Sequence, residues 1–192
     1  FDHIEVKKQK REFITHTGVY KGKRISVIST GIGTDNIDIV YNELDALVNI
    51  DLKTRTIKDQ LSSLYLVRIG TSGSLQADIP VDEFVCSTYG LGLDGLLNFY
   101  KLVNSEDENS IVQAFRNHYP NHGILPQSYI AAASQSLQTL LSEGMHSGIT
   151  ASCSGFYAPQ MRQLRLEPSR IDMIEKLHTF RYGAHRITNF EM

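Results

Sequence analysis

The sequence has little cysteine, no excess of charge of either sign and no long apolar run. Only two of its 192 residues are cysteines, Cys86 and Cys153, and they stand far apart without CxxC spacing. This excludes a disulfide framework and a cysteine-rich zinc site. The 19 basic and 21 acidic residues are scattered along the chain and leave a formal net charge of −2. Because no basic stripe is present, a nucleic acid is not an expected partner.

Targeting signals are missing too. No apolar run approaches the length of a membrane span, and the first residues do not form a signal peptide. We therefore expect a cytoplasmic protein with no membrane partner.

Several short motifs with known chemistry are also absent, namely HExxH, Walker A and the GxSxG elbow. His118 and His122 stand four apart, but Pro120 between them argues against a helical metal pair. Gly90-Leu91-Gly92-Leu93-Asp94-Gly95 matches GxGxxG after an expected strand. The acidic residue wanted about twenty positions later falls near Phe115, outside any expected strand. A flexible turn is therefore the better interpretation, and a dinucleotide site the lesser one.

The residues that are present alternate between strand and helix patterns. Hydrophobic residues make up 41% of the chain, enough for one sizeable core. We expect strands at residues 12–20, 23–30, 64–69, 83–88, 145–153 and 186–190. We expect helices after an N-cap at Asp35, at 129–143 before a glycine C-cap, and at 169–180 with Ser169 as N-cap. Residues 51–60 and 104–110 are polar and predict a surface excursion, with room for another helix, and a solvated loop. This alternation predicts a single α/β domain over residues 1–192 around a largely central sheet.

A turn at residues 68–73 departs from the apolar strand before it. Arg68 is the penultimate residue of the expected strand, and Gly70-Thr71-Ser72-Gly73 follow it. The planar fork of arginine suits phosphate oxygens, while glycines let backbone N–H groups converge on an anion, and Thr71 and Ser72 add hydroxyl donors. An arginine that caps a sheet edge and pairs with a carboxylate explains the same residues equally well. From these residues alone, both interpretations stay open.

A second cluster is Phe156-Tyr157-Ala158-Pro159-Gln160-Met161-Arg162. Gln160 and Arg162 stand two apart, so in an extended chain both side chains point to one side. They offer donors and an acceptor in one plane, and Phe156 offers a stacking face. A flat heterocycle with two carbonyls and an imide N–H needs such a set. An aromatic loop with a solvated arginine is the alternative that these residues favour by themselves.

Read in order, these segments resemble the uridine phosphorylase branch of the nucleoside phosphorylase family. The matching features are Arg11-Glu12-Phe13, Ser29-Thr30-Gly31-Ile32-Gly33, Arg68 to Gly73, Gly148-Ile149-Thr150-Ala151-Ser152, Phe156-Tyr157 with Gln160 and Arg162, and Asn189-Phe190-Glu191-Met192. The resemblance implies an α/β fold with a distorted mixed central β-sheet flanked by helices. It also implies reversible phosphorolysis of uridine to uracil and ribose 1-phosphate, a pentosyl transfer that uses inorganic phosphate as co-substrate and no cofactor.

The resemblance also implies roles for single residues, grouped by the part of the substrate that they would contact. Those for phosphate are Arg11 of a neighbouring subunit, Arg68 and Thr71; those for the base are Gly73, Phe156, Gln160 and Arg162; those for the ribose are Thr71 and Met192. Arg68 and Arg162 would be the catalytic pair, and Thr30 and Ile32 would shape the floor of the site. Glu12 is a candidate for a monovalent-cation site at the subunit interface, although Asn36 stands where a serine is often found. No other metal is implied.

The resemblance further implies parts that this sequence does not contain. These are a glycine-aspartate-proline phosphate loop before Phe1, a ribose-binding glutamate directly after Met192, and C-terminal helices that complete the base pocket. The sequence is therefore expected to be a fragment, or to lack its ends. The implied assembly is a homodimer or hexamer that shares active sites through Arg11. A purine nucleoside phosphorylase, a nucleosidase of the same family and a non-catalytic nucleoside-binding module remain as alternatives, although the pair Gln160 and Arg162 argues against the purine enzyme.

Overall fold

The computed structural model describes residues 1–120, 125–169 and 171–192. The chain divides into two units, Phe1–Val67 and Arg68–Met192, each of which is described by itself. That the two units form one domain over residues 1–192 stays a prediction.

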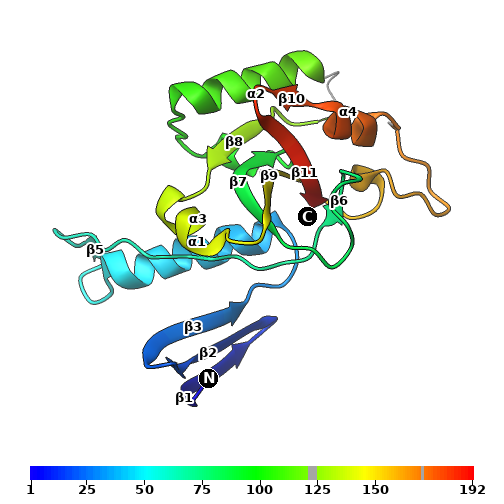
Figure 1. The fold of residues 1–192 in the computed structure, drawn as a ribbon. Coiled ribbons are helices and arrows are strands. Elements are labelled where there is room, and N and C mark those ends of the chain that lie inside the picture. The colour runs from blue at the N-terminus through cyan, green and yellow to red at the C-terminus, as the bar shows by residue number, and fades with distance from the viewer. Residues whose placement is uncertain (121–124, 170) are drawn as a thin grey trace. The chain divides into compact units, whose positions relative to one another are not determined.

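The first unit is a three-stranded meander followed by a helix and a small hairpin (Figure 1). Its elements are β1 His3–Lys10, β2 Phe13–Tyr20, β3 Lys23–Ser29, α1 Thr34–Asn49, β4 Ile50–Asp51 and β5 Thr56–Ile57. Lys21 and Gly22, between β2 and β3, have φ of 46° and 74°, as the favoured two-residue hairpin turn requires. The strands predicted at 12–20 and 23–30 are thus confirmed. Gly33 rather than Asp35 is the N-cap of α1, and residues 51–60 contain a hairpin strand instead of a helix.

The second unit is built on a six-stranded mixed sheet in the order β10-β11-β9-β7-β8, with β6 pairing to β11. Three parallel strands form its centre and lie side by side in Figure 1: β7 Val85–Gly92, β9 His146–Ser152 and β11 His185–Glu191. The antiparallel strands at its margins are β6 Gly73–Ser74, β8 Tyr129–Ala132 and β10 Arg181–Tyr182. The predicted mixed central sheet is confirmed, as are the strands expected at 83–88, 145–153 and 186–190.

The sheet is distorted where its central strands meet. The pairing register of β7 and of β11 each contains one more residue than the facing stretch of β9. The extra residues are Thr88 on β7 and Thr188 on β11, and both lie opposite Gly148–Thr150. A β-bulge of this kind bends the strand and re-aims the side chains next to it. Gly148 leaves room for the second bulge, because a Cβ there would lie 2.2 Å from Thr188 Cγ2.

Helices cover the sheet and complete its core. They are α2 Glu106–His118, which packs on β8, α3 Gln135–Leu141, which packs on β7, and α4 Met173–Thr179, which packs on β11, with short 3-10 turns at Leu96–Phe99 and Ala158–Gln160. The side chains buried between these elements include Leu91, Ile111, Phe115, Ile130, Ile149, Leu177, Phe180 and Ile187. Burying one such side chain stabilises the fold by about 1.5–3 kcal/mol. This apolar core holds the ends of the parallel strands in fixed positions.

Two further predictions were wrong, for residues 64–69 and for residues 104–110. Residues 64–69 form no strand: Tyr65 is 81% and Ile69 89% exposed. Within the described ranges, no strand pairs with this segment, and an apolar run cannot be a buried strand without neighbours. Residues 104–110, expected as a loop, contain the start of α2. There Ser105 and Glu108 form a capping box, so the polar residues are a helix start.

Two predicted helices begin in the wrong place. Residues 129–143 divide into β8 and α3, because Tyr129 to Ala132 pair with Tyr89 to Gly92 of β7. The helix expected at 169–180 is shorter, and its N-cap is Asp172 instead of Ser169. The alanines and leucines of residues 129–143 are compatible with a strand or a helix. Pairing with β7 therefore determines that Tyr129 to Ala132 form a strand.

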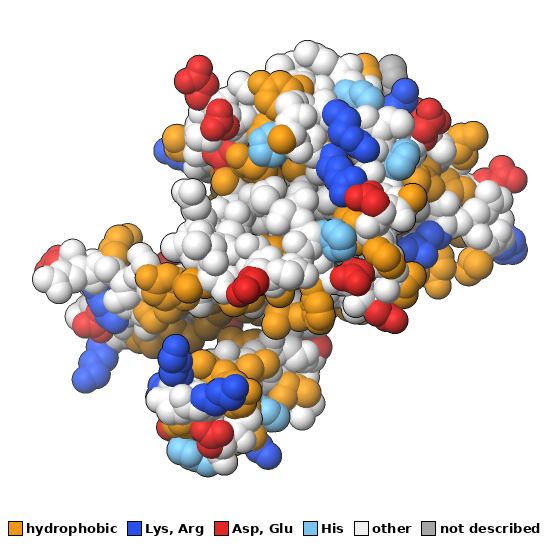
Figure 2. All heavy atoms as spheres, viewed as in Figure 1, with side chains coloured by type: hydrophobic (Ala, Val, Ile, Leu, Met, Phe, Trp, Pro, Cys, Tyr) orange, Lys and Arg blue, Asp and Glu red, His pale blue; other side chains and the backbone are white. Residues whose placement is uncertain are grey.

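The surface matches the balanced charge of the sequence. Basic and acidic side chains are interspersed on the face shown in Figure 2. Among the described residues, no helix has both the length and the apolarity needed to cross a membrane.

Candidate functional site

The carboxyl ends of β7, β9 and β11 meet at one edge of the second unit's sheet. The turn at residues 68–74 lies against this edge, because β6 pairs with the last residues of β11, Gly73 with Phe190 and Ser74 with Asn189. In open α/β sheets, ligands bind outside the carboxyl ends of parallel strands. The predicted anion turn therefore stands where a site is expected.

Arg68 forms an ion pair at this edge. Its Nη1 donates to Oε2 of Glu191 at 2.6 Å, and the two side chains are 37% and 19% exposed. The guanidinium also folds back over Gly70, where a Cβ would lie 3.2 Å from Nη1. The arginine thus has the carboxylate partner of one sequence interpretation, while a guanidinium has further N–H groups beyond the one in this pair. Both interpretations can hold at once.

The rest of the turn is tied to the sheet. Nδ2 of Asn189 donates to Oγ of Ser72 at 2.8 Å, and Thr71 next to it is exposed. Thr71 therefore lies between an arginine bound to Glu191 and a serine bound to Asn189. The predicted phosphate residues Arg68 and Thr71 sit on one short segment whose two ends are both fixed.

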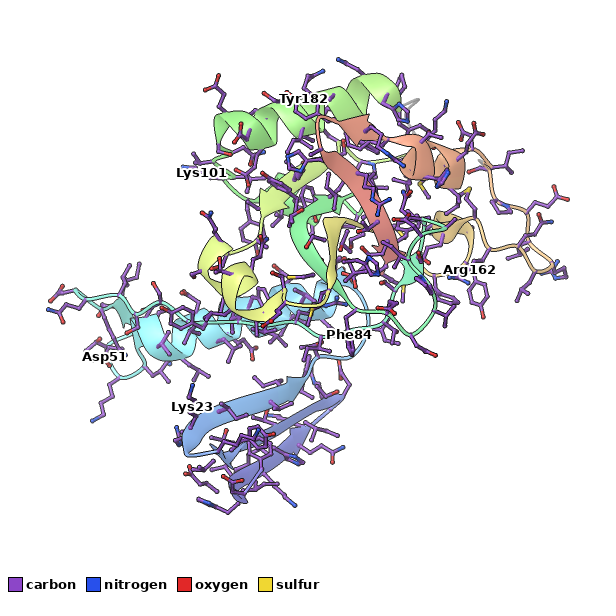
Figure 3. The ribbon with its side chains drawn as sticks, viewed as in Figure 1. Lys23, Asp51, Phe84, Lys101, Arg162 and Tyr182 are labelled. Atoms are coloured by element: carbon purple, nitrogen blue, oxygen red, sulfur yellow. The ribbon has the colours of Figure 1, made fainter. Side chains whose placement is uncertain are left out.

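The aromatic segment after β9 reaches the same turn. The guanidinium of Arg162 lies over the ring of Phe156, 4.3 Å from its centroid, at a separation where the cation and ring attract. A Cβ on Gly73 would lie 3.7 Å from Nη2 of Arg162. Figure 3 shows Arg162 on the segment that follows β9, beside the end of β11. The structure therefore brings the Arg68 turn and the base residues predicted from the sequence together.

The conformation of this segment differs from the predicted one. Residues 158–160 form a 3-10 turn, and Met161 has φ of 58°, so the extended stretch assumed for Gln160 to Arg162 is wrong. Gln160 is only 7% exposed, so its side chain is not solvated.

Cys153, at the end of β9, lies behind this segment. Its Sγ donates to the carbonyl of Gly155 at 3.0 Å, and burial raises the pKa of its thiol. The thiol is therefore neutral near pH 7. We interpret Cys153 as a packing residue beside the segment of residues 156–162 and not as a nucleophile.

The GxGxxG match forms no dinucleotide turn. Gly90 and Gly92 belong to β7, and only Gly95 turns the chain, with φ of 88°. A Cβ on Gly92 would lie 2.0 Å from Cζ of Tyr129. The Tyr129 hydroxyl donates to both carboxylate oxygens of Asp94 at 2.7 and 2.9 Å. Gly92 therefore makes room for Tyr129, and the flexible turn predicted for the whole motif is wrong for its first half.

The remaining predicted residues belong to the first unit, apart from Met192, which directly follows β11. Arg11 is exposed at the turn between β1 and β2 and has φ of 54°. A Cβ on Gly31 would lie 3.5 Å from Cγ of Glu12 and 2.6 Å from Nδ2 of Asn36. The structure thus gathers the cation candidate Glu12 and Asn36 around one glycine.

The loop before α1 supplies the two residues predicted for the floor. The hydroxyl of Thr30 donates to the carbonyl of Gly31 at 3.5 Å, and Nδ2 of Asn36 donates to the carbonyl of Ile32 at 3.3 Å. The Ile32 side chain is 74% exposed. Polar groups of this loop thus bond its backbone, and the loop exposes the apolar side chain of Ile32.

No role was assigned to Glu191, Asn189 or Thr150 from the sequence alone. The signal at Thr150 and Asn189 is a polar residue on a central strand, where it is buried and needs a specific partner. For metals, the described residues contain no group of three or more His, Cys, Asp or Glu placed as ligands. His118 Nε2 instead lies 3.0 Å from the carbonyl of Lys176, and His122 falls outside the described residues.

Comparison with known proteins gives two similar enzymes of different substrate class. A uridine phosphorylase of Thermococcus kodakarensis is 31% identical over 153 residues, which are 79% of this chain and 44% of that enzyme. A DeoD-type purine nucleoside phosphorylase of Listeria welshimeri is 38% identical over 77 residues, 40% of this chain and 28% of that enzyme. The chain thus spans less than half the length of these two relatives.

A solved structure and a family model extend over more of the chain. The crystal structure of a Trypanosoma brucei nucleoside phosphorylase, which shows uridine phosphorylase activity, superposes with a TM-score of 0.85 at 25% identity. It covers 100% of this chain, which corresponds to 70% of the trypanosome one. A family model described as the phosphorylase superfamily matches residues 1–181. Because that match covers nearly the whole sequence, the chain belongs to the phosphorylase superfamily.

Proposed function

We propose that this chain forms the greater part of a nucleoside phosphorylase whose substrate is uridine, with uracil and ribose 1-phosphate as products. One observation carries the proposal: the Arg68 turn and the segment with Gln160 and Arg162 meet at Gly73, on the edge where three parallel strands end. An anion site and a site for a flat base are therefore adjacent, as attack by phosphate on a nucleoside requires. The relatives named uridine phosphorylase support the choice of base.

Phosphate is bound by Arg68 and by the hydroxyl and backbone of Thr71. The guanidinium of Arg68 supplies charge, while the turn that includes Gly70 supplies N–H donors. Arg11 of a neighbouring subunit adds a second guanidinium, since it stands exposed at the tip of a hairpin. The proposed assembly is accordingly a homodimer, or a hexamer built from it. The main task of these residues is to hold the nucleophile in line with the anomeric carbon.

The uracil ring is held by Gln160, Arg162 and Phe156. The buried Gln160 amide fixes the orientation of the base through one carbonyl and the imide N–H. Arg162, held in place on the Phe156 ring, donates to the other carbonyl. Met192 packs on the ribose beside Thr71.

The reaction breaks the bond from C1′ of ribose to N1 of uracil and forms one from C1′ to a phosphate oxygen. The electron pair of the broken bond moves into the uracil ring, and its negative charge spreads to the carbonyl oxygens. The Arg162 guanidinium stabilises that charge by hydrogen bonding, so no acid is required at the ring. The released uracil anion then takes a proton from water. Phosphate, already dianionic, stabilises the positive charge that builds on the sugar.

A purine nucleoside is the second candidate, favoured by the 38% identity to the DeoD-type enzyme. An amide and a guanidinium can also donate to a purine carbonyl. The match to that enzyme covers only 40% of this chain, against 79% for the uridine phosphorylase, so we favour uridine.

The test is base release from uridine and from inosine, each with and without phosphate, by the whole protein that contains this chain. Uracil release that depends on phosphate is expected. Release without phosphate would show a nucleosidase, a preference for inosine would overturn the uridine assignment, and no release from either would favour a binding module.

A further inference from the structure

A line of hydrogen-bonded polar side chains crosses the sheet and ends at the Arg68 turn. It starts on β7 at Ser87, whose Oγ lies against Oγ1 of Thr150 on β9. Oγ1 of Thr150 donates to Oδ1 of Asn189 on β11 at 2.9 Å. Nδ2 of Asn189 then donates to Oγ of Ser72 at 2.8 Å. Four segments distant in sequence are joined in this way.

The oxygen and the nitrogen of the Asn189 amide have different partners in this line. Oδ1 of Asn189 also accepts the hydroxyl of Thr188 at 2.9 Å. Each of these two hydroxyls has a second oxygen beside it, Ser87 Oγ for Thr150 and the Ile149 carbonyl for Thr188. The NH₂ group faces Ser72, whose oxygen accepts. The proton of the Ser72 hydroxyl is left to point away from Asn189.

The middle of the line is inaccessible to water. Thr188 is 0%, Asn189 5% and Thr150 6% exposed. Buried polar groups that are fully paired hold a single geometry, because every alternative leaves one of them without a partner. Ser72, by contrast, is exposed and belongs to the turn. The buried part can therefore serve as a rigid support for a surface segment.

We propose that Asn189 is a positioning residue that sets the conformation of the anion turn through Ser72. The next residue toward the carboxyl terminus is already fixed by the pairing of Gly73 with Phe190. The Asn189 bond extends that support by one residue, to the neighbour of Thr71. With both places held, the Thr71 hydroxyl and the adjacent N–H groups keep one orientation toward the anion. This inference rests on the proposed function, since it concerns the same phosphate.

Ser72→Ala tests the proposal at the exposed end, where it leaves the buried amide in place. We expect its KM for phosphate to rise about three- to tenfold, the size expected for the loss of one neutral hydrogen bond that holds the turn. The kcat and the KM for uridine should change less than about twofold, because the base segment is untouched. Ser72→Thr keeps the hydroxyl and should restore the KM for phosphate. Ser74→Ala is the matched control, because the Ser74 hydroxyl bonds the Gln76 carbonyl and not Asn189.

Thr150→Val separates positioning from direct contact. It removes a hydroxyl from the buried support at similar volume, on a strand that does not pair with the turn. A Ser72 that acted only by touching phosphate would be indifferent to this change. We expect the KM for phosphate to rise in Thr150→Val as well, in a protein whose circular dichroism is native. The stabilisation of each protein by added inorganic phosphate, measured as a shift in Tm, gives the same comparison without turnover.

The outcomes are separable. Suppose that the wild-type protein uses phosphate, and that Ser72→Ala and Thr150→Val both have the wild-type KM for phosphate. This result would overturn the positioning role alone. So would an equal effect of Ser74→Ala, or a parallel loss of kcat and of both KM values. A wild-type protein that neither releases base nor is stabilised by phosphate overturns the proposed function and this inference together.

Discussion

Arg68→Ala should damage phosphate use for two reasons, and the second can be reversed by another substitution. The Arg68 guanidinium is bound to Glu191 at 2.6 Å. Removing it deletes a donor to phosphate and also leaves the Glu191 carboxylate, which is 19% exposed, without this cation. That charge then repels the incoming anion. Glu191→Gln on the Arg68→Ala background keeps the shape of the side chain and removes the repulsion.

The size of both effects follows from the geometry. Loss of a hydrogen bond to a charged partner costs about 1.5–3 kcal/mol, or roughly 10–150-fold in affinity. A phosphate across the guanidinium lies about 6 Å from the carboxylate, where two unit charges at an effective dielectric of 20 repel by roughly 3 kcal/mol. Solvent at this partly exposed site reduces the repulsion to about 1–2 kcal/mol. We therefore expect the double variant to recover about 5–30-fold of the lost affinity.

The assay is the initial rate of base release at increasing phosphate, in wild type, both single variants and the double variant. The recovery should be larger at low ionic strength than at high, because salt screens the repulsion. A double variant no better than Arg68→Ala at low salt would refute the reasoning, since it would show that Glu191 does not repel the anion.

Three further outcomes are expected. Arg162→Ala should lower kcat/KM for uridine about 10–150-fold while the KM for phosphate changes little. Initial rates of uracil release at varied uridine and phosphate concentrations can check this. Glu108→Ala should lower Tm by roughly 2–4 °C, because Glu108 accepts the N–H groups of Ser105 and Ala132. Those bonds hold the pKa of Glu108 below its ordinary 4.5, so this difference in Tm should be full above that pH and disappear as the pH falls through the lowered value; a constant difference would contradict it. Cys153 should react with a thiol reagent more slowly than the half-buried Cys86, since burial raises its pKa, and mass spectrometry of partly labelled protein would show the reverse if the reasoning is wrong.

The strands of this fold were predictable where the sequence alternates or is β-branched between clear turns. The hairpin around Lys21 and Gly22 is one case, and the central strands ending near Ser152 and Phe190 are others, whereas β1 was not among the expected strands. Residues 64–69 show that a local apolar pattern does not determine a strand. Their apolar run is identical to that of a buried strand, but burial depends on neighbours, and the run itself carries no information about them.

Part of the candidate site, namely the Arg68 turn and the segment with Gln160 and Arg162, could be picked out from the sequence, whereas the bonds that join its residues could not. Single residues such as Arg68 and Arg162 stand out because a charge follows apolar or aromatic neighbours. The bonds from Arg68 to Glu191 and from Ser72 to Asn189 join residues more than a hundred positions apart. Such pairs depend on the register of β6 against β11, which no local pattern specifies.

The bulge at Thr188 makes the length of β11 as important as its composition. The extra residue bends the strand and increases its local twist, which re-aims the side chains that follow it. Deleting Thr188 would remove the bulge, because Ile187 and Asn189 would then pair with the consecutive residues Ile149 and Thr150 of β9. The bend that aims Asn189 and Glu191 at Ser72 and Arg68 would be lost with it. A substitution of Thr188 therefore keeps the extra residue of the bulge, whereas a deletion removes it. Insertions and deletions among functional relatives of this chain should avoid residues 185–191 and collect in the surface segments, such as the hairpin of β4 and β5.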